Sequence, residues 1–370
     1  MTAEIARRRP LRTAREFVAA GLVTPTAETA IAAVTARYSA AMSQDLAALI
    51  DPADARDPIA RQFVPDTREL ETRPDERADP IGDDAYSPTP GLVHRYEDRV
   101  LLKIVSACPV YCRFCFRREM VGEGKGGLLP EAGIAAALAY VAGHPEVWEV
   151  ILTGGDPLAL SPRRLREVLA RIAAIPHVRT IRIHTRVPVV LPSHVDGALV
   201  AALRSIDRPV YVALHANHPR ELSDAARAAC ALLVDGGVPM VSQTVLLAGV
   251  NDDADVLVAL MRAFVEARVT PYYLHHPDLA PGTGHFRLPV ARGRELVAAM
   301  QARLSGLARP RYVLDLPGGF GKVSLEPAAA RPAGDGSRWT IRDRAGRMHD
   351  YADALDASAG SNVAKSPDCP

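Results

Sequence analysis

The chain has 370 residues, of which 48% are hydrophobic and 24% charged, so its composition is that of a globular protein and excludes a disordered or fibrous one. Its formal net charge of +1 gives no electrostatic reason to expect nucleic acid or an anionic membrane as a partner. No uninterrupted apolar run reaches the ~18 residues that a membrane span needs.

Cysteine and lysine usage stand out in this ordinary composition. Three of the five cysteines crowd into Cys108, Cys112 and Cys115, which is a poor disulfide framework and indicates a reducing compartment, so we expect a cytoplasmic protein. Only four of the 44 basic residues are lysines. A GC-rich genome explains the excess of arginine, but chemistry that needs a primary amine has only these lysines available.

The N-terminal quarter reads as helices followed by a connector. The first residues are rich in arginine, but Glu4 and Glu16 interrupt them, so we expect a helical start and no transit peptide. Residues 26–50 carry apolar side chains at helical spacing, and 51–92 are rich in Pro, Asp and Arg. The sequence therefore predicts a helical region with a connector over 1–93.

From residue 94 onward, short β-rich runs alternate with amphipathic helical stretches. A strand and a helix every ~30 residues are typical of βαβ units with a parallel sheet. Six or seven such units favour an α/β fold with a complete or partial (β/α) barrel, over 94–306, followed by a C-terminal segment over 307–345. The small, polar residues 346–370 predict a disordered tail. The expected strands are 99–105, 148–153, 179–184, 209–214, 239–246, 270–275 and 311–316, and the expected helices include 161–174, 193–205, 220–235, 253–267 and 289–305.

Unusual polar residues follow the predicted strands. In α/β barrels the loops at the carboxyl ends of the strands meet on one face and carry the reactive groups. The sequence therefore predicts a catalytic face. In chain order, its clusters are the cysteine motif, 153–156, 184–186, 215–218, Gln243, 275–278 and 315–322.

The cysteine motif is Cys108-x3-Cys112-x2-Cys115. Three thiolates at this spacing can bind three irons of a cube-shaped [4Fe–4S] cluster and leave the fourth iron open to another ligand. Zinc, a disulfide and buried free thiols are the alternatives. Structural zinc commonly needs a second cysteine pair, and the odd number disfavours a disulfide. The spacing therefore favours an iron–sulfur cluster.

Lys322 ends the glycine-rich run 317–321. A P-loop is excluded because its first glycine would fall at position 316, which is leucine. A lysine in such a turn at a barrel mouth can form a Schiff base with an aldehyde cofactor, which arginine cannot do. The alternative is a solvated loop lysine. The other lysines lie in a strand, a flexible loop and the tail, which suits them less to this role.

Two resemblances connect these motifs. The cysteine motif, with Tyr111 and Phe114 before its second and third cysteines, resembles that of the radical S-adenosylmethionine (SAM) superfamily. Residues 153–156 match the glycine-rich strand end of that superfamily. The alternative is that Gly-Gly-Asp-Pro forms an ordinary turn. Over about 94–325 the chain is similar to the lysine 2,3-aminomutase family. The motifs that carry this resemblance are His94-Arg95-Tyr96-x-x-Arg99, Arg117-Arg118, Arg186-x-Pro188-Val189-Val190-Leu191-Pro192, His215-x-Asn217-His218-Pro219, Gln243-x-Val245-Leu246-Leu247-x-Gly249-Val250-Asn251-Asp252 and Pro317-Gly318-Gly319-x-Gly321-Lys322.

The resemblance implies a partial (β/α)6-type radical SAM barrel and three cofactors: a [4Fe–4S] cluster, SAM and pyridoxal 5′-phosphate (PLP). In the family, SAM binds the open iron, and its reductive cleavage gives a 5′-deoxyadenosyl radical. Lys322 is implied to be catalytic as the amine that binds PLP. The implied ligands are Cys108, Cys112 and Cys115 for the cluster, Gly154, Gly155, Asp156, Arg186, His215 and Gln243 for SAM, and Lys322, Arg95, Tyr96 and Arg99 for PLP.

The resemblance also implies a substrate. Arg117 would bind the carboxylate of lysine, while Asp278 and Asp315 would bind its ε-ammonium group. Two carboxylates from different strand ends favour a distal cation and disfavour shorter or neutral amino acids. In the alternative interpretation Asp278 caps a turn, Asp315 ends a strand, and Arg95 and Arg99 are a surface pair. The implied activity is that of an isomerase that interconverts L-lysine and β-lysine by 2,3-amino migration.

Several alternatives remain open. The run 115–118 and the short C-terminus resemble a neighbouring branch that supplies β-lysine for the modification of translation elongation factor P, and another amino acid is an alternative substrate. From other classes, a radical SAM enzyme without PLP and a non-catalytic metal-binding barrel would each give a different absorbance spectrum.

Zinc is not expected. Family members with a long C-terminal extension bind zinc through a mid-chain cysteine and a cysteine cluster in that extension. Cys230 takes the mid-chain position but only Cys369 follows it, so Cys230 is predicted to be a core residue. The expected partners are free lysine and a reducing electron donor such as flavodoxin or ferredoxin, and a homo-oligomer is compatible with the sequence.

Overall fold

The computed structural model describes residues 9–122, 127–326, 330–333, 338–342 and 347–352. The chain divides into two units, Met1–Leu325 and Glu326–Pro370. The second carries a three-stranded antiparallel sheet of β10 (Ala330–Ala333), β11 (Arg338–Arg342) and β12 (Met348–Ala352). The sequence predicted disorder over 346–370, and β12 corrects this prediction for its own residues. The backbone of β12 pairs with β11 along its whole length, so this segment forms a regular strand. Residues 353–370 lie outside the described residues.

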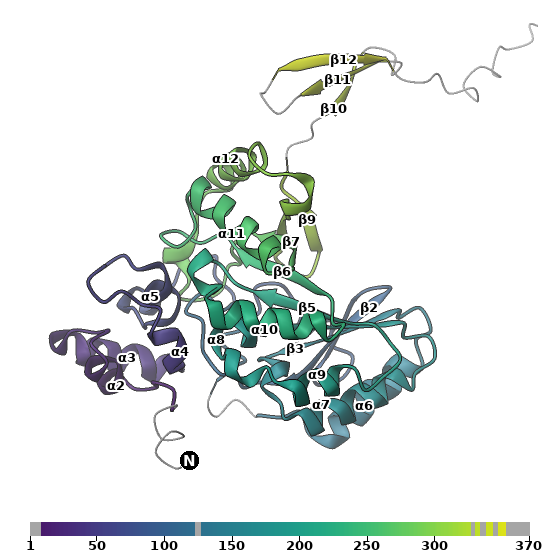
Figure 1. Cartoon of the computed structure of the whole chain (residues 1–370), viewed down its shortest axis with the longest axis horizontal. Helices are drawn as coiled ribbons and strands as arrows, with labels where there is room; N and C mark the ends of the chain where they lie inside the picture. Colours follow the sequence, from purple (N-terminus) through teal and green to yellow (C-terminus); the bar gives the residue numbers. More distant parts are fainter. Residues whose placement is uncertain (1–8, 123–126, 327–329, 334–337, 343–346, 353–370) are drawn as a thin grey trace, which may run out of the picture. The chain divides into compact units, whose positions relative to one another are not determined.

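The first unit is built on a nine-stranded sheet whose order in space is its order in sequence. β2 to β8 are parallel, while β1 and β9 pair antiparallel at the two edges. The sheet is therefore the predicted partial barrel, with every expected strand present (Figure 1). The strands are β1 (Leu92–Tyr96), β2 (Arg99–Val105), β3 (Glu149–Gly154), β4 (Thr180–Thr185), β5 (Val210–His215), β6 (Met240–Val245), β7 (Thr270–His275), β8 (Arg311–Leu316) and β9 (Gly321–Ser324).

Helices connect the parallel strands, as parallel pairing requires. α7 shows why the local sequence folds this way: Ser161 caps its first turn, Pro162 starts it, and Leu165, Leu169 and Ile172 bury one face. Buried leucines of α7, α9 and α10 belong to the same hydrophobic core as residues of β3 and β5, and Figure 1 shows these three helices next to the two strands. The connecting helices are α6 (Glu131–Ala142), α7 (Pro162–Ala173), α8 (Val187–Val190), α9 (Gly197–Leu203), α10 (Asp224–Asp235), α11 (Ala254–Glu266) and α12 (Val290–Gln301), with 3-10 turns η4 (Pro157–Ala159), η5 (Pro192–His194), η6 (Pro219–Glu221), η7 (Gly284–Phe286) and η8 (Gly306–Ala308).

Short helices precede the sheet. Phe17 and Met42 from this region belong to the same hydrophobic core as Val150 and Ile181 of the strands, so the N-terminal region packs on the barrel. The segments are α2 (Ala14–Ala19), η1 (Pro25–Ala27), α3 (Glu28–Arg37), α4 (Gln44–Ala47), α5 (Pro58–Phe63), η2 (Thr67–Leu70) and η3 (Asp84–Tyr86).

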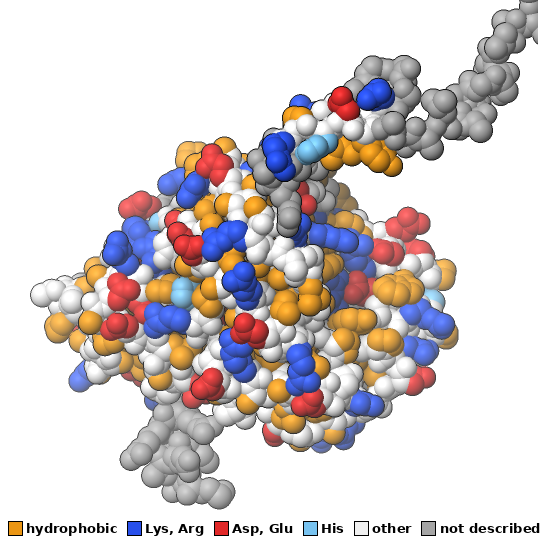
Figure 2. Space-filling model, turned by 45° about the horizontal axis from the view of Figure 1, so that its top comes forward, with side chains coloured by type: hydrophobic (Ala, Val, Ile, Leu, Met, Phe, Trp, Pro, Cys, Tyr) orange, Lys and Arg blue, Asp and Glu red, His pale blue; other side chains and the backbone are white. Residues whose placement is uncertain are grey.

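The surface matches the balanced composition. Figure 2 shows Lys and Arg side chains interspersed with Asp and Glu over the visible face. Among the described residues, no helix combines the length and the apolar character that crossing a membrane requires.

Candidate active site

Every residue that the sequence assigned to a cofactor or to substrate lines one cavity of about 250 Å³. The cavity lies at the carboxyl ends of the parallel strands, where an α/β barrel gathers its loops. The assigned residues that line it are Arg95, Tyr96, Arg99, Cys108, Cys112, Cys115, Arg117, Gly154, Gly155, Asp156, Arg186, His215, Gln243, Asp278, Asp315 and Lys322.

The three cysteines lie on the loop that follows β2 and line the part of the cavity called the cysteine end. Burial raises the pKa of all three thiols, and that of Cys115 reaches about 11, with the nearby Cys112 as a second cause. Thiols in such a setting become thiolates only when a strong positive charge compensates them. No group of three Cys, His, Asp or Glu side chains among the described residues is arranged to hold a single metal ion. This donor set fits an iron–sulfur cluster, in which each thiolate binds its own iron.

A glycine turn at the end of β3 lies beside the cysteine loop. Gly154 has a φ of +108°, and the amide of Gly155 donates to the carbonyl of Val105 at 2.5 Å. A side chain at position 155 would overlap the backbone of Ala107. Only glycine therefore allows this strand end to approach the cysteine loop backbone to backbone.

Asp156 ties the ends of β3 and β4 together. Its carboxylate accepts hydrogen bonds from Thr185 Oγ1 at 2.6 Å and from the amide of Arg186 at 2.7 Å. Burial raises the pKa of Asp156, although these hydrogen bonds oppose the rise. Because both oxygens already accept bonds from the protein, Asp156 holds the shape of the cavity wall.

Arg186 joins the cysteine loop to two residues that the sequence did not single out. Its Nη1 donates to Cys112 Sγ at 3.2 Å, while Nη2 contacts Glu221 and lies 3.3 Å from Gln62 Oε1. Glu221 and Gln62 are both fully buried. Glu221 closes a capping box with His218 in the structure, but a histidine at that position does not match the usual sequence pattern, and nothing in the sequence around Gln62 indicates its role.

The histidines in the cavity are neutral at physiological pH. Burial, followed by the charge of Arg186, lowers the pKa of His215 to about 3, and burial also lowers the pKa of His184 well below its usual range. His184 lies 3.3 Å from the amide nitrogen of Gln243, and its ring centroid is 5.8 Å from that of His215. These side chains therefore offer hydrogen bonds without adding charge.

Lys322 lines a second part of the cavity, the lysine end. β8 and β9 pair antiparallel with Asp315 opposite Lys322, so the two side chains share one face of the sheet. Lys322 Nζ lies 2.8 and 2.9 Å from the two carboxylate oxygens of Asp315. The amide of Lys322 donates to the hydroxyl of Tyr96 at 2.8 Å. This arrangement holds a primary amine at the cavity wall with its side chain 29% exposed, within reach of a ligand.

The two carboxylates near Lys322 differ in charge. Burial and the neighbouring Asp315 raise the pKa of Asp278 to about 7. Burial also acts to raise the pKa of Asp315, but His275 and Lys322 outweigh it and hold that pKa below its usual range. Asp315 is thus ionised in the ligand-free chain and Asp278 is poised to ionise when a cation arrives.

Arg95 and Arg117 both donate hydrogen bonds to Asp83, which the sequence did not indicate as a site residue. Arg95 Nη2 donates to Asp83 Oδ1 at 2.7 Å, and Arg117 Nη2 donates to Asp83 Oδ2 at 3.0 Å. Arg117 also donates to Thr153 Oγ1 at 3.2 Å. Among the described residues, neither arginine has a hydrogen-bond partner for its buried Nε, which fits a site for anionic groups.

Arg99 and Tyr96 lie at the edge of the same end. The guanidinium of Arg99 stacks on the Tyr96 ring, 3.7 Å from its centroid, and donates to Asp98 at 2.6 Å. The Arg99 side chain is 31% exposed, whereas that of Arg95 is 7% exposed. The geometry therefore makes Arg95 the more buried of the two cations predicted for a phosphate.

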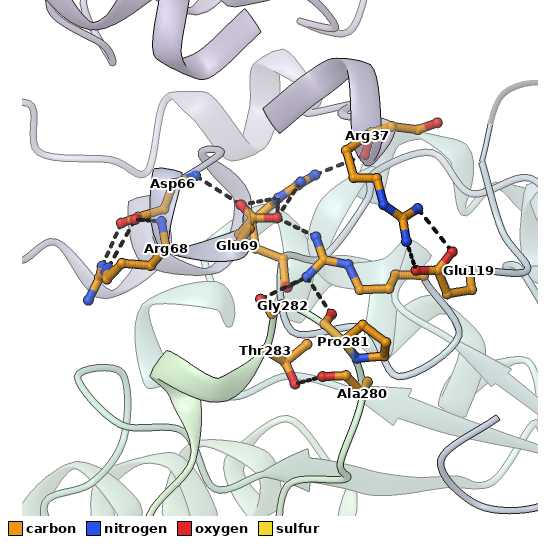
Figure 3. Close-up of polar contacts among 12 residues, drawn as sticks. Arg37, Asp66, Arg68, Glu69, Glu119, Ala280, Pro281, Gly282 and Thr283 are labelled. Carbon is orange, nitrogen blue, oxygen red and sulfur yellow. Dashed lines mark hydrogen bonds and ion pairs between the residues drawn. The ribbon is translucent and has the colours of Figure 1, made fainter. Parts of the chain in front are cut away.

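Glu69 from η2 supports the cysteine loop from outside the cavity. Arg113 donates to Glu69 from Nε at 2.9 Å and from Nη2 at 2.6 Å, and Arg118 also contacts this carboxylate. All three side chains are buried. Figure 3 shows these contacts around Glu69 together with the separate pair Arg37–Glu119. The connector thus contributes Glu69, Gln62 and Asp83 to the site, although its composition indicated only a linking role.

The two cysteines outside the cysteine motif lie away from the cavity lining or outside the described residues. Cys230 is fully buried in α10, within the main hydrophobic core. Cys369 lies outside the described residues.

The chain is similar to known proteins over most of its length. Residues 102–261 match the model of the radical SAM superfamily. The chain is 42% identical to an L-lysine 2,3-aminomutase of Acetoanaerobium sticklandii, over 75% of this chain and 67% of the relative. It is 40% identical to an L-lysine 2,3-aminomutase of Methanococcus maripaludis, over 84% and 71% of the two chains. A glutamate 2,3-aminomutase of Clostridioides difficile is 34% identical, over 80% and 69%.

Proposed function

The chain belongs to the lysine 2,3-aminomutase family of radical SAM enzymes, and from this premise we propose that it interconverts L-lysine and β-lysine by 2,3-amino migration. It is an isomerase whose family uses a [4Fe–4S] cluster, SAM and PLP.

One observation carries the proposal for lysine: the same cavity presents an arginine and two carboxylates to a substrate. Arg117 offers a guanidinium for the α-carboxylate, while Asp278 and Asp315 offer negative charge for the ε-ammonium. Glutamate would instead bring a second carboxylate to the two aspartates, which repel it. The charges of the cavity therefore favour a substrate with a distal cation.

The cysteine end and the lysine end of the cavity would bind different cofactors. When bound, the cluster and SAM supply a carbon-centred radical, and PLP supplies a conjugated ring that delocalises an unpaired electron. Cys108, Cys112 and Cys115 would hold the cluster, and the Lys322 amine would hold PLP. The SAM residues would be Gly154, Gly155, Asp156, Arg186, His215 and Gln243, with Arg95, Tyr96 and Arg99 around PLP.

The remaining residues orient and protect the reacting groups. Neutral His184 and His215 add no charge that would compete with Arg117 or the aspartates. The buried cavity wall excludes water from a reactive radical, which limits side reactions. A low-potential protein of the flavodoxin or ferredoxin class would supply the electron that starts the reaction.

The test is an amino acid assay with the anaerobically reconstituted enzyme, dithionite, SAM and PLP. We expect conversion of L-lysine to β-lysine with a kcat/KM at least about 100-fold above that for glutamate, because the two aspartates discriminate by charge. Amino acid analysis of the products measures both rates. Turnover of glutamate without turnover of lysine would overturn the assignment of the substrate.

A further inference from the structure

Asp83 lies in the connector, directly before η3, yet it is 1% exposed and binds two arginines that line the cavity. Its two carboxylate oxygens take different partners: Oδ1 accepts from Arg95 and Oδ2 accepts from Arg117. The Nζ of Lys103 lies 4.0 Å from Oδ2. One buried carboxylate therefore serves three cations that come from β1, β2 and the cysteine loop.

The charge of Asp83 is maintained by these neighbours. Burial acts to raise the pKa of Asp83, but Arg117, Lys103 and Arg95 outweigh it and lower the pKa below its usual range. Without this carboxylate, three buried cations would face one another with no shared counter-charge, and like charges in a low-dielectric site repel strongly. The carboxylate of Asp83 thus fixes the positions of the Arg95 and Arg117 guanidinium groups.

The loop that carries Asp83 is itself held firmly. The backbone amides of Asp83 and Asp84 each donate to the carboxylate of Asp79 at 2.9 Å. Gly82 has a φ of +70°, and a Cβ there would lie 2.5 Å from the amide nitrogen of Gly319. The loop therefore packs backbone to backbone on the glycine-rich run that precedes Lys322, so its position is linked to that of the proposed PLP lysine.

We propose that Asp83 is a positioning residue that holds Arg95 and Arg117 in a fixed relative orientation, and so couples the site for the PLP phosphate to the site for the substrate carboxylate. The identity of the two anions rests on the proposed function. A substitution of Arg117 changes the orientation of the Asp83 carboxylate and therefore its hydrogen bond to Arg95. It thus changes the affinity for PLP even when no substrate is present.

The first experiment compares Asp83→Asn with Asp84→Asn in the full-length, anaerobically reconstituted enzyme. Asp84 is the matched control because it is the adjacent aspartate and is exposed. We expect Asp83→Asn to weaken PLP binding and to raise the KM for lysine by about tenfold each, with a smaller change in kcat, because both arginines lose the charged partner that orients them. Asp84→Asn should stay within about twofold of the unmodified enzyme.

The second experiment tests the coupling directly, and its first measurement, on the single variant Arg117→Lys, does not depend on the folding of Asp83→Asn. Arg117→Lys keeps the positive charge but loses the fork geometry, and we expect it to weaken PLP binding about threefold in lysine-free enzyme. In an Asp83→Asn background the same change should have no further effect, because the link is already cut. The visible absorbance of bound PLP, titrated with free PLP, measures each affinity.

The results separate the two proposals. The iron–sulfur spectrum and the melting temperature report whether each variant is folded. Unchanged PLP affinity in Arg117→Lys, or equal PLP affinity in folded Asp83→Asn and Asp84→Asn, would overturn the role of Asp83. Absence of lysine turnover in the unmodified enzyme would instead overturn the proposed substrate, and the PLP titrations would still decide the coupling.

Discussion

The cysteine end and the lysine end of the cavity lining are prepared for their ligands in opposite ways. At the cysteine end, buried thiols have raised pKa values, Glu69 holds Arg118 of the cysteine loop, and Glu221 holds Arg186, which follows β4. At the lysine end, the charged pair Lys322–Asp315 is already formed across two adjacent strands. The thiols of the cysteine end therefore need a metal centre to ionise, whereas Lys322 and Asp315 are charged before any ligand binds.

The largest expected effect is at the cysteine end. Cys112→Ala should remove a ligand of the cluster and abolish turnover, a loss of about 10⁴-fold or more, because no radical forms without the cluster. PLP binding should persist, since Lys322 and Asp315 are untouched. Iron content and the anaerobic absorbance spectrum measure the two ends separately. Loss of both chromophores in a folded variant would show that the ends are not independent.

The reciprocal variant is Lys322→Ala. We expect it to abolish the visible absorbance of bound PLP and the activity, because no other amine of the described cavity lining can take its place, while the iron–sulfur spectrum stays intact. Lys322→Arg is the matched control, since it keeps the charge near Asp315 but cannot form an imine. A persistent PLP band in either variant would mean that Lys322 is not the residue that binds PLP.

A smaller effect on stability is expected when the buried ion pairs of Glu69 are removed, and a still smaller one when the more exposed pair of Glu119 is removed. Glu69→Gln leaves the buried Arg113 and Arg118 without a counter-charge and should lower the free energy of unfolding by about 3 to 5 kcal/mol. Iron occupancy should fall, with PLP affinity unchanged. The control is Glu119→Gln, which breaks the pair with the half-exposed Arg37 and should cost no more than about 1 kcal/mol. Denaturant titrations measure both, and equal losses would contradict the distinction.

The smallest effect is a pH dependence at the lysine end. The pKa of Asp278 is raised to about 7, so this side chain is mostly protonated at pH 6 and mostly ionised at pH 8. We expect the KM for lysine to fall about tenfold over that range, because the ε-ammonium binds the ionised form. Asp278→Asn should have a higher KM that no longer changes with pH.

The same raised pKa has a consequence for stability. The folded chain binds the proton of Asp278 more tightly than the unfolded chain does, so this group stabilises the fold at low pH. That contribution is lost as the pH rises from about 4 through about 7. Denaturant titrations at several pH values, compared with Asp278→Asn, measure it, and a pH profile identical in both chains would contradict the raised pKa.

Local patterns predicted much of this molecule. The alternation of apolar runs and amphipathic stretches identified the parallel strands, because a buried strand and a surface helix impose different periods on the sequence. The placement of the assigned residues around one cavity followed from that topology, because parallel strands bring their carboxyl ends to one rim.

The residues that support the site could not be predicted in the same way. Asp83 meets Arg117 across 34 positions, Glu69 meets Arg113 across 44, and Gln62 meets Glu221 across 159. These residues have ordinary neighbours in a connector with little periodicity, so the sequence carries no local sign of their partners.

The sequence by itself thus determined which chemical groups this protein brings to its cavity, namely three thiols, one amine and a set of arginines and aspartates. The tertiary structure decided which carboxylate holds which cation, and so which groups are charged before a ligand binds. The physical reason is that strand and helix periods are local properties of the chain, whereas the pairing and burial of a charge depend on segments that only folding brings together.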